Sequence, residues 1–380
     1  MRRSRGAVAL LLGGLLTTTA AACGSDKAAT TTAAAATTTA SAAATSAASS
    51  GAIPGSTTAT AGASTAVSTG ATAAGGKAFS WTMVTDQAGL GDKGFNDLAY
   101  AGLNKAAADL GGKAHAIESS EQAQYVPNLQ QAVDDGATMT VGIGFLLTDA
   151  LVQVATEKPN AKFVSIDSDV LGPDKKPIPN VASVTFKENE GAYLAGIIAG
   201  KTTKTNKIGF VGGLEIPPVV RFLKGFQAGV ASVNPAATVS IAYVGGFTDP
   251  VKTKSLASAD YDAGADIVFE VAGGGGLGAY EEAKARGKGF WVIGTDTCKE
   301  ALAPDNFLTS ATKDVSGAVY TEAKAVADGT FKGGLISLGL KDGGVGVCQD
   351  NFASLQADVQ AAVKTATTAV SNGSITVPSQ

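Results

Sequence analysis

The chain has 380 residues, which is enough for about two ordinary domains, and 45% of them are apolar, so it can bury a sizeable core. Its 29 basic and 33 acidic residues give a formal net charge of −4, which disfavours binding to nucleic acid. The single histidine, His115, excludes a metal site built on a histidine pair and disfavours a catalytic triad.

Residues 1–22 are predicted to be a signal peptide. Arg2, Arg3 and Arg5 form a charged start, and the apolar run 7–16 that follows is too short to span a bilayer. Small residues then lead directly to Cys23, as in a bacterial lipobox, although Ala20 stands where Leu is usual. We therefore expect Cys23 to be the lipidated mature N-terminus; the alternative is an ordinary secretory signal with a chance cysteine.

Residues 23–76 are predicted to be a disordered linker behind that anchor. Between 24 and 76, the only residues other than Ala, Thr, Ser and Gly are Asp26, Lys27, Ile53, Pro54 and Val67. Such a tract buries too little apolar surface to offset the entropy lost on ordering. The folded part should begin near Lys77.

From there, short apolar runs alternate with segments of helical periodicity. The runs predict strands at 79–86, 139–145, 162–167, 207–212, 239–244, 266–271, 290–295 and 307–311. The periodic segments predict helices at 95–110, 128–135, 148–156, 189–202, 218–233, 251–263, 278–286, 315–328 and 352–370. This alternation is typical of an α/β fold with parallel sheets, in which ligands bind at the carboxyl ends of strands.

Two segments resemble catalytic or cofactor-binding motifs, but neither meets the requirements of its motif. Gly200-Lys201-Thr202 resembles the end of a phosphate-binding loop, but it lies inside a predicted helix. The glycine-rich segment 273–278 (GGGGLG) fits the dinucleotide-binding spacing, with Asp296 placed to hold a ribose diol, yet no acid–base residue accompanies it. Cys298 and Cys348 lack metal-site spacing, and a disulfide is the expected use of the pair in an exported chain.

Several segments resemble the basic-membrane-protein family, whose members are substrate-binding lipoproteins of nucleoside ABC importers. The first signature is matched by residues 86–96 (DQAGLGDKGFN), and the second by 211–229 with its Pro217, Arg221-Phe222 and Gly225-Phe226. Further matches occur in the family's order at 142–145, 186–196, 272–274, 309–310 and 313. The chain departs from the family pattern at Gly94, Cys298 and Lys299, which bears on ligand choice.

The resemblance implies the type I periplasmic-binding-protein fold, in which two doubly wound parallel-sheet lobes are joined by crossover hinge strands. Lobe I is then expected to comprise 77–187 plus 313–335, and lobe II 188–312 plus 336–380. Crossovers are expected near 186–188, 310–313 and 333–345. Ligand would be held between the two lobes.

The resemblance also assigns roles at matched positions. Phe95 and Phe222 would stack on the two faces of a flat base. Because Phe222 lies at helical spacing with Phe226, the alternative is that Phe222 and Phe226 are both core residues. Asp86 and Asn96 would contact the base edge, and the backbone N–H of Gly273 would approach the sugar. Asp296 would accept hydrogen bonds from the ribose hydroxyls, unless it only caps a turn, and Lys313 would donate to ribose oxygens.

The leading expectation is therefore an extracytoplasmic, lipid-anchored protein that delivers a nucleoside, in particular a purine nucleoside, to ABC permease subunits. It is expected to be a monomer that needs no cofactor, binds no nucleic acid, contacts the membrane through its lipid only, and is not an enzyme. A sugar-type ligand and a ligand sensor without transport are the alternatives. A nicotinamide enzyme and a sugar-repressor-type regulator are disfavoured by the export signal.

Overall fold

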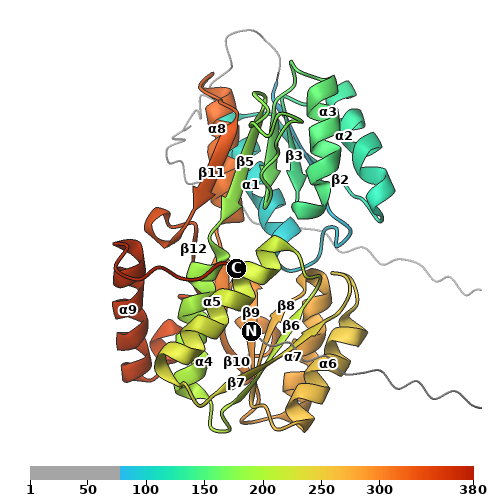
Figure 1. The fold of residues 1–380 in the computed structure, drawn as a ribbon. Coiled ribbons are helices and arrows are strands. Elements are labelled where there is room, and N and C mark those ends of the chain that lie inside the picture. The colour runs from blue at the N-terminus through green and yellow to red at the C-terminus, as the bar shows by residue number, and fades with distance from the viewer. Residues whose placement is uncertain (1–77) are drawn as a thin grey trace, which may run out of the picture. The chain divides into compact units, whose positions relative to one another are not determined.

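The computed structural model describes residues 78–380, so the predicted signal peptide, Cys23 and the linker lie outside the described residues. The described chain builds two six-stranded sheets, each covered by helices (Figure 1). We call the first sheet with its helices lobe I and the second lobe II. No helix among the described residues is long and apolar enough to cross a membrane.

The sheet of lobe I is entirely parallel, in the order β11-β5-β4-β3-β1-β2. Its strands are β1 (Ser80–Val84), β2 (Lys113–Ile117), β3 (Met139–Ile143), β4 (Phe163–Ile166), β5 (Val181–Phe186) and β11 (Gly334–Leu338). The strand order reverses between β1 and β3, which makes that edge the topological switch point where ligands bind in such sheets.

Lobe II repeats this plan in the order β12-β10-β9-β8-β6-β7, with its switch point between β6 and β8. Its strands are β6 (Lys207–Gly212), β7 (Thr238–Tyr243), β8 (Ile267–Val271), β9 (Trp291–Asp296), β10 (Phe307–Lys313) and β12 (Val345–Val347). Only β12 runs antiparallel to its neighbour, β10.

Each sheet is buried on both faces, as the continuous apolar runs of its central strands require. In lobe I, α1 (Phe95–Leu110) and α8 (Val315–Ala327) cover one face, while α2 (Tyr125–Asp134) and α3 (Thr148–Glu157) cover the other. In lobe II, α4 (Glu188–Thr202), α5 (Pro217–Val233) and α9 (Ala357–Ser371) oppose α6 (Pro250–Asp262) and α7 (Leu277–Arg286).

The chain passes between the lobes three times. It leaves lobe I after β5, returns between β10 and α8, and leaves again between β11 and β12. The boundary expected at 335/336 is wrong in detail, because it cuts β11, whose five residues all pair with β5. Lys313 still belongs to β10 of lobe II, where it pairs with Val345, so the return to lobe I comes after it.

The predicted helices and central strands are present, with ends that differ by a few residues. Four strands were not predicted: β2, β5, β11 and β12. The last predicted helix is also shorter than 352–370, because residues 352–354 form a separate 3₁₀ turn and the chain is extended at Leu355 before α9 begins.

Candidate functional site

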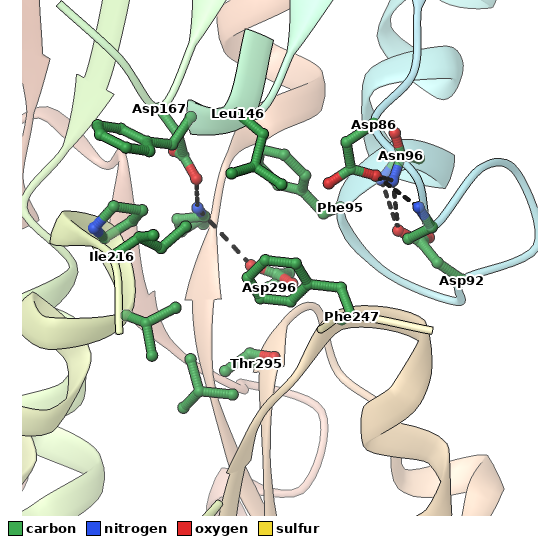
Figure 2. A pocket seen from close by; sticks show the side chains of 18 of the residues that line it. Asp86, Asp92, Phe95, Asn96, Leu146, Asp167, Ile216, Phe247, Thr295 and Asp296 are labelled. Atoms are coloured by element: carbon green, nitrogen blue, oxygen red, sulfur yellow. Dashed lines mark hydrogen bonds and ion pairs between the residues drawn. The ribbon is translucent and has the colours of Figure 1, made fainter. Parts of the chain in front are cut away.

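A cavity lies between the lobes, at the carboxyl ends of the strands near both switch points (Figure 2). It holds about 590 Å³ of space not occupied by protein atoms, its open mouth included. All seven predicted ligand-binding residues line this cavity: Asp86, Phe95, Asn96, Phe222, Gly273, Asp296 and Lys313. The fold thus brings together residues that are up to 227 positions apart, since 313 − 86 = 227.

 The side chains that line the cavity include residues at the ends of β1, β4 and β9, in the first turn of α1 and the first two turns of α5, and the last residue of β10.

Asp86 and Asn96 form one wall of the cavity, on lobe I. Asp86 Oδ1 accepts hydrogen bonds from Ala88 N at 3.0 Å and from Asn96 Nδ2 at 2.9 Å. Asn96 Nδ2 also donates to Asp92 Oδ2 at 3.0 Å, so both amide hydrogens are used on carboxylates. In this structure Asn96 thus orients Asp86 with its amide hydrogens, while its Oδ1 is buried and has no hydrogen-bond partner among the described residues. The expected contact of Asn96 with a base edge stays a prediction.

Asp92 has a structural role in the same loop. Its two carboxylate oxygens accept hydrogen bonds from the backbone N–H groups of Gly94, Asn96 and Asp97, at 2.9, 2.8 and 3.3 Å. These are free N–H groups at the start of α1, so Asp92 caps the helix that presents Phe95 and Asn96.

Burial raises the pKa of Asp86 to about 6, against the lowering effect of the hydrogen bonds from Asn96 and Ala88. The carboxylates of Asp92 and Asp167 act in the same direction as burial. Asp86 is therefore ionised at neutral pH but sits close to the pH at which it takes up a proton.

Two aromatic rings approach the cavity from different lobes. Phe95 opens α1 in lobe I, and Phe222 lies in the second turn of α5 in lobe II. The Lys313 ammonium lies 4.5 Å from the ring centre of Phe95 and 5.8 Å from that of Phe222, so both rings border the same space. Phe247, from the loop after β7, lines the cavity as well and was not predicted.

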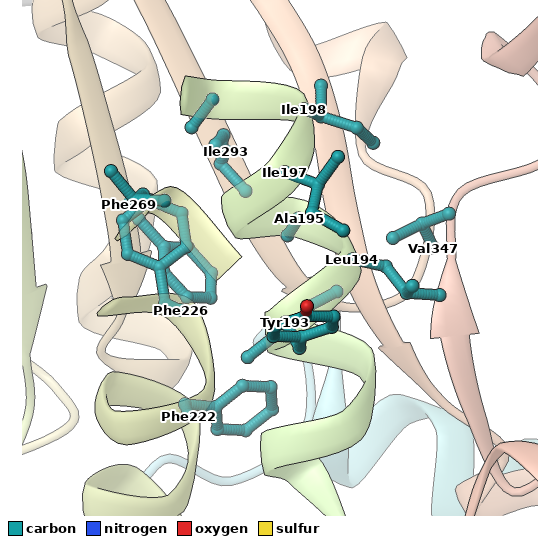
Figure 3. Close-up of a cluster of buried hydrophobic side chains, with 14 of the residues drawn as sticks. Tyr193, Leu194, Ala195, Ile197, Ile198, Phe222, Phe226, Phe269, Ile293 and Val347 are labelled. Atoms are coloured by element: carbon teal, nitrogen blue, oxygen red, sulfur yellow. The ribbon is translucent and has the colours of Figure 1, made fainter. Parts of the chain in front are cut away.

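Phe222 is at once a core residue and a cavity residue. Its ring packs edge-on against Phe269, with centres 6.1 Å apart, inside the cluster formed by α4, α5 and the sheet of lobe II (Figure 3). The expected role of Phe222 in the site and its alternative role in the core are thus compatible, because the same ring contacts the core and lines the cavity.

Lys313 is the central charge of the site. Its ammonium donates to Asp167 Oδ2 at 2.6 Å and lies 3.7 Å from Glu188 Oε1 and 3.9 Å from Asp296 Oδ1. Burial acts to lower the pKa of Lys313, but the three carboxylates outweigh it and hold the pKa above its ordinary value. Lys313 therefore stays protonated at physiological pH and ties both lobes together through Asp167 and Asp296.

Asp296 occupies a strained position at the end of β9. Its backbone has φ of +68°, a left-handed conformation that is uncommon outside glycine, and its side chain is buried. Burial raises its pKa, while Lys313 and Lys299 oppose the shift. Gly273, which also lines the cavity, has a left-handed backbone as well, with φ of +55°. The nearby Phe247 side chain leaves little room for a Cβ at this position.

Three charged residues of this region were missed by the sequence reasoning. Asp167 directly follows β4, and Asp296 is the last residue of β9, so the position of Asp167 after a strand could have identified it. Glu188 and Arg221 form a buried pair, with Arg221 Nε donating to Glu188 Oε2 at 2.5 Å. Burial raises the pKa of Glu188, and nothing in the sequence links two residues 33 positions apart.

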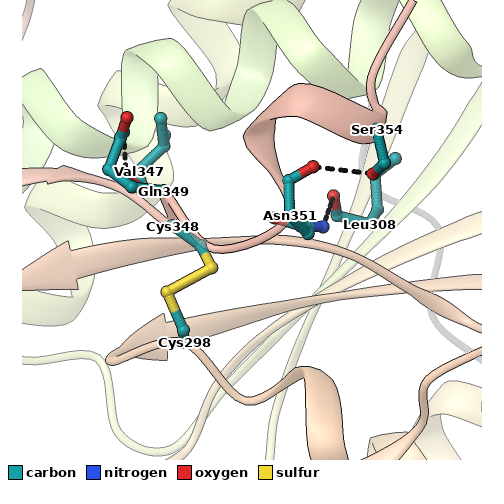
Figure 4. Close-up of a disulfide and its surroundings, with 7 residues drawn as sticks. All are labelled: Cys298, Leu308, Val347, Cys348, Gln349, Asn351 and Ser354. Atoms are coloured by element: carbon teal, nitrogen blue, oxygen red, sulfur yellow. Dashed lines mark hydrogen bonds between the residues drawn. A yellow bond between two sulfur atoms is a disulfide. The ribbon is translucent and has the colours of Figure 1, made fainter.

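The predicted pairing of Cys298 with Cys348 is present in lobe II as a disulfide, with a Cα–Cα distance of 5.1 Å (Figure 4). Cys298 follows β9 and Cys348 follows β12. One end of the bond, Cys298, is therefore only two residues from Asp296, which lines the cavity.

Two doubly wound lobes, three crossings between them and a polar cavity at the facing strand ends define a solute-binding protein of the periplasmic-binding-protein fold. The chain belongs to the family described as ABC transporter substrate-binding protein PnrA-like, whose profile matches residues 79–380. Members of this family are substrate-binding proteins, not enzymes, in agreement with the expectation from the sequence.

Relatives and solved structures support the assignment. The chain is 39% identical over 318 residues to the ABC transporter nucleoside-binding protein BmpA of Lactococcus lactis, covering 78% of this chain and 88% of BmpA. It is 37% identical over 292 residues to basic membrane protein A of Borreliella burgdorferi, covering 76% and 84%. A solute-binding protein of an ABC transporter system from Aeropyrum pernix matches with a TM-score of 0.73 and 30% identity, covering 80% and 94%.

Proposed function

We propose that this protein binds a nucleoside, in particular a purine nucleoside, between its two lobes and delivers it to the permease of an ABC importer. The observation that carries the proposal is the pair of aromatic rings, Phe95 and Phe222, which border one cavity from different lobes. Stacking on an aromatic ring contributes about 1–3 kcal/mol per base. Because each lobe supplies one ring, full stacking requires the lobes to be closed, and ligand binding favours that state.

The polar groups of the cavity suit the rest of a nucleoside. Asp296 and Lys313 supply an acceptor and a donor for ribose hydroxyls, and Asp86 supplies an acceptor for an N–H on the base edge. The cavity is lined by four carboxylates, from Asp86, Asp92, Asp167 and Asp296, but by one ammonium, from Lys313. This excess of negative charge opposes an added phosphate, so the proposal is for nucleosides rather than nucleotides.

Isothermal titration against a panel of nucleosides, free bases, nucleoside 5′-monophosphates and simple sugars tests the proposal. The protein is first unfolded and refolded to remove any bound ligand. Purine nucleosides are expected to bind more tightly than free bases, and monophosphates to bind weakly. Binding of sugars without binding of nucleosides would instead establish the sugar-type alternative.

We further propose that Cys23 carries a lipid and anchors the protein outside the cytoplasm, as a monomer that meets the permease at the membrane. The support is the short apolar run and the small residues that precede this cysteine in the sequence. The variant Cys23→Ser is expected to leave the membrane fraction. Retention of that variant in the membrane fraction, with unchanged lipid labelling, would contradict the anchor. Co-purification of the permease separates transport from ligand sensing alone.

A further inference from the structure

Cys298 of the disulfide lies between two buried charged residues in the sequence, Asp296, which lines the cleft, and Lys299, which pairs with the buried Glu270. Asp296 is the last residue of β9, Cys298 follows it by two positions, and Lys299 comes directly after Cys298. Asp296 and Lys299 are both buried, with 8% and 4% of their surface exposed. The covalent bond is therefore made within the segment that presents these two charges.

The bond ties this segment to the opposite side of β10. In the sheet, β9 and β12 flank β10, with Asp296 paired to Thr312 and Val347 paired to Ala311. Cys348 directly follows β12, and its N–H donates to Ser310 O at 2.9 Å. The disulfide thus crosses β10, the strand that ends in Lys313, and fixes the segment 296–299 against it (Figure 4).

The charges on either side of Cys298 need such support. Asp296 has a left-handed backbone, which costs of order 1–3 kcal/mol and persists only where the surroundings enforce it. Its contact with Lys313, at 3.9 Å, is longer than a hydrogen bond. Lys299 Nζ donates to the buried Glu270 Oε1 at 3.3 Å, and a Cβ on Gly94 of lobe I would lie 3.3 Å from that nitrogen.

Behind this segment lies open space into which it could relax. A second cavity, with about 1820 Å³ of space not occupied by protein atoms, open solvent included, is lined in part by Asp296, Thr297, Cys298 and Lys313. Asp296 and Lys313 line both cavities and so form the partition between them. A segment freed from the disulfide can turn its carboxylate into the second cavity, where water would solvate it.

We propose that the Cys298–Cys348 disulfide is a positioning bond of the ligand site, which holds Asp296 toward the cleft and so sets the preference for ligands with a vicinal diol. The inference deepens the proposed nucleoside binding and rests on it. Cys298 and Cys348 do not contact the ligand in this proposal; they act through Asp296.

The test compares the double variant Cys298→Ala/Cys348→Ala with Val359→Ala, a control in the buried core of lobe II on α9, away from the cleft. Ribonucleoside and 2′,3′-dideoxynucleoside are titrated well below the melting temperature of each protein. The double variant is expected to lose about tenfold or more in ribonucleoside affinity, as for loss of a hydrogen bond to a charged group, and under about threefold for the dideoxy ligand. Equal losses for both ligands, or none, would overturn the proposal.

Two further measurements keep the proposal testable. Hydrogen exchange of the amides at 296–300 in the empty protein should be faster in the double variant than in the wild type or in Val359→Ala; unchanged protection overturns the proposal whether or not nucleosides bind. Where the double variant does not fold, dithiothreitol opens the bond in the wild type. Each cysteine sulfur then takes one electron and one proton, and the dithiol is oxidised to its cyclic disulfide. A wild type that ignores nucleosides refutes the proposed function instead.

Discussion

Replacing Asp86 with Asn should stabilise the empty protein while weakening nucleoside binding. Asp86 is 9% exposed, and burial raises the pKa of its carboxyl to about 6. Its Oδ1 already accepts two hydrogen bonds, from Ala88 N and Asn96 Nδ2. An Asn side chain can keep both of these hydrogen bonds through its own carbonyl oxygen and carries no charge to bury.

The size and the sign of the effect follow from the raised pKa. The gap between about 6 in the folded protein and the ordinary 3.8 corresponds to about 3 kcal/mol, at 1.36 kcal/mol per pH unit. Because the folded pKa is the higher one, the folded state holds the proton while the unfolded chain has released it. Stability is therefore lost as pH rises from 3.8 to about 6, and the full penalty applies above that. Water in the cavity screens part of it, so about 1–2 kcal/mol of stabilisation by Asp86→Asn is expected at pH 7.5.

Urea denaturation of the wild type and Asp86→Asn at pH 7.5 and pH 4.5 measures this effect. The difference in the free energy of unfolding should be largest at pH 7.5 and should shrink at pH 4.5, where the folded wild type is protonated. The exposed Asp135→Asn serves as the control and should change stability little at either pH. An Asp86→Asn protein that is no more stable than the wild type at pH 7.5 would refute the reasoning. Its nucleoside affinity should fall about tenfold, because the base loses a charged acceptor.

Three other substitutions test the remaining parts of the site. Phe95→Leu keeps apolar bulk in a buried position but removes the ring. By titration, the free energy of nucleoside binding should become less favourable by about 1–3 kcal/mol, the contribution of one stacked base. An unchanged affinity would rule out stacking on Phe95. Asp296→Asn suits the left-handed backbone and should weaken ribonucleosides more than 2′,3′-dideoxynucleosides, whereas equal losses would exclude a contact with the diol. Lys313→Met leaves three buried carboxylates without their ammonium and should cost about 3–5 kcal/mol in urea denaturation. The exposed Lys105→Met control should cost under about 1 kcal/mol, and a similar loss in both would contradict the role of Lys313.

The central strands were predictable from the sequence because they are short apolar runs, buried on both faces. Three of the four missed strands lack this pattern, whereas β5 is buried but carries Ser183 and Thr185 among its apolar residues. β2 is an edge strand that is only partly buried and contains Lys113 and His115, and β11 alternates between half-buried and exposed residues. β12 has three residues, and its place beside β10 depends on a crossing of the chain that no local pattern indicates.

The site could be predicted where a residue follows a strand or matches a family signature. Asp86, Gly273 and Asp296 follow β1, β8 and β9, and the fold brings all three to the cavity. What local sequence does not contain is which groups neutralise one another. Arg221 pairs with Glu188, and Asn96 donates to two carboxylates, because the tertiary fold buries Glu188 and Asn96 away from water.

Each lobe places one aspartate beside the Lys313 ammonium, and the two do so in the same way. β4 and β9 hold the same place in sheets of the same strand order. An aspartate with a left-handed backbone stands at the carboxyl end of each, with φ of +73° for Asp167, directly after β4, and +68° for Asp296, the last residue of β9. Both carboxylates lie within 4 Å of the Lys313 ammonium, one from each lobe. A charge held between the lobes makes the facing carboxylates less repulsive when they approach. Lys313 thereby favours the closed arrangement in which Phe95 and Phe222 border one space. The residue that we propose to contact the ligand thus also lowers the cost of closing the lobes around it.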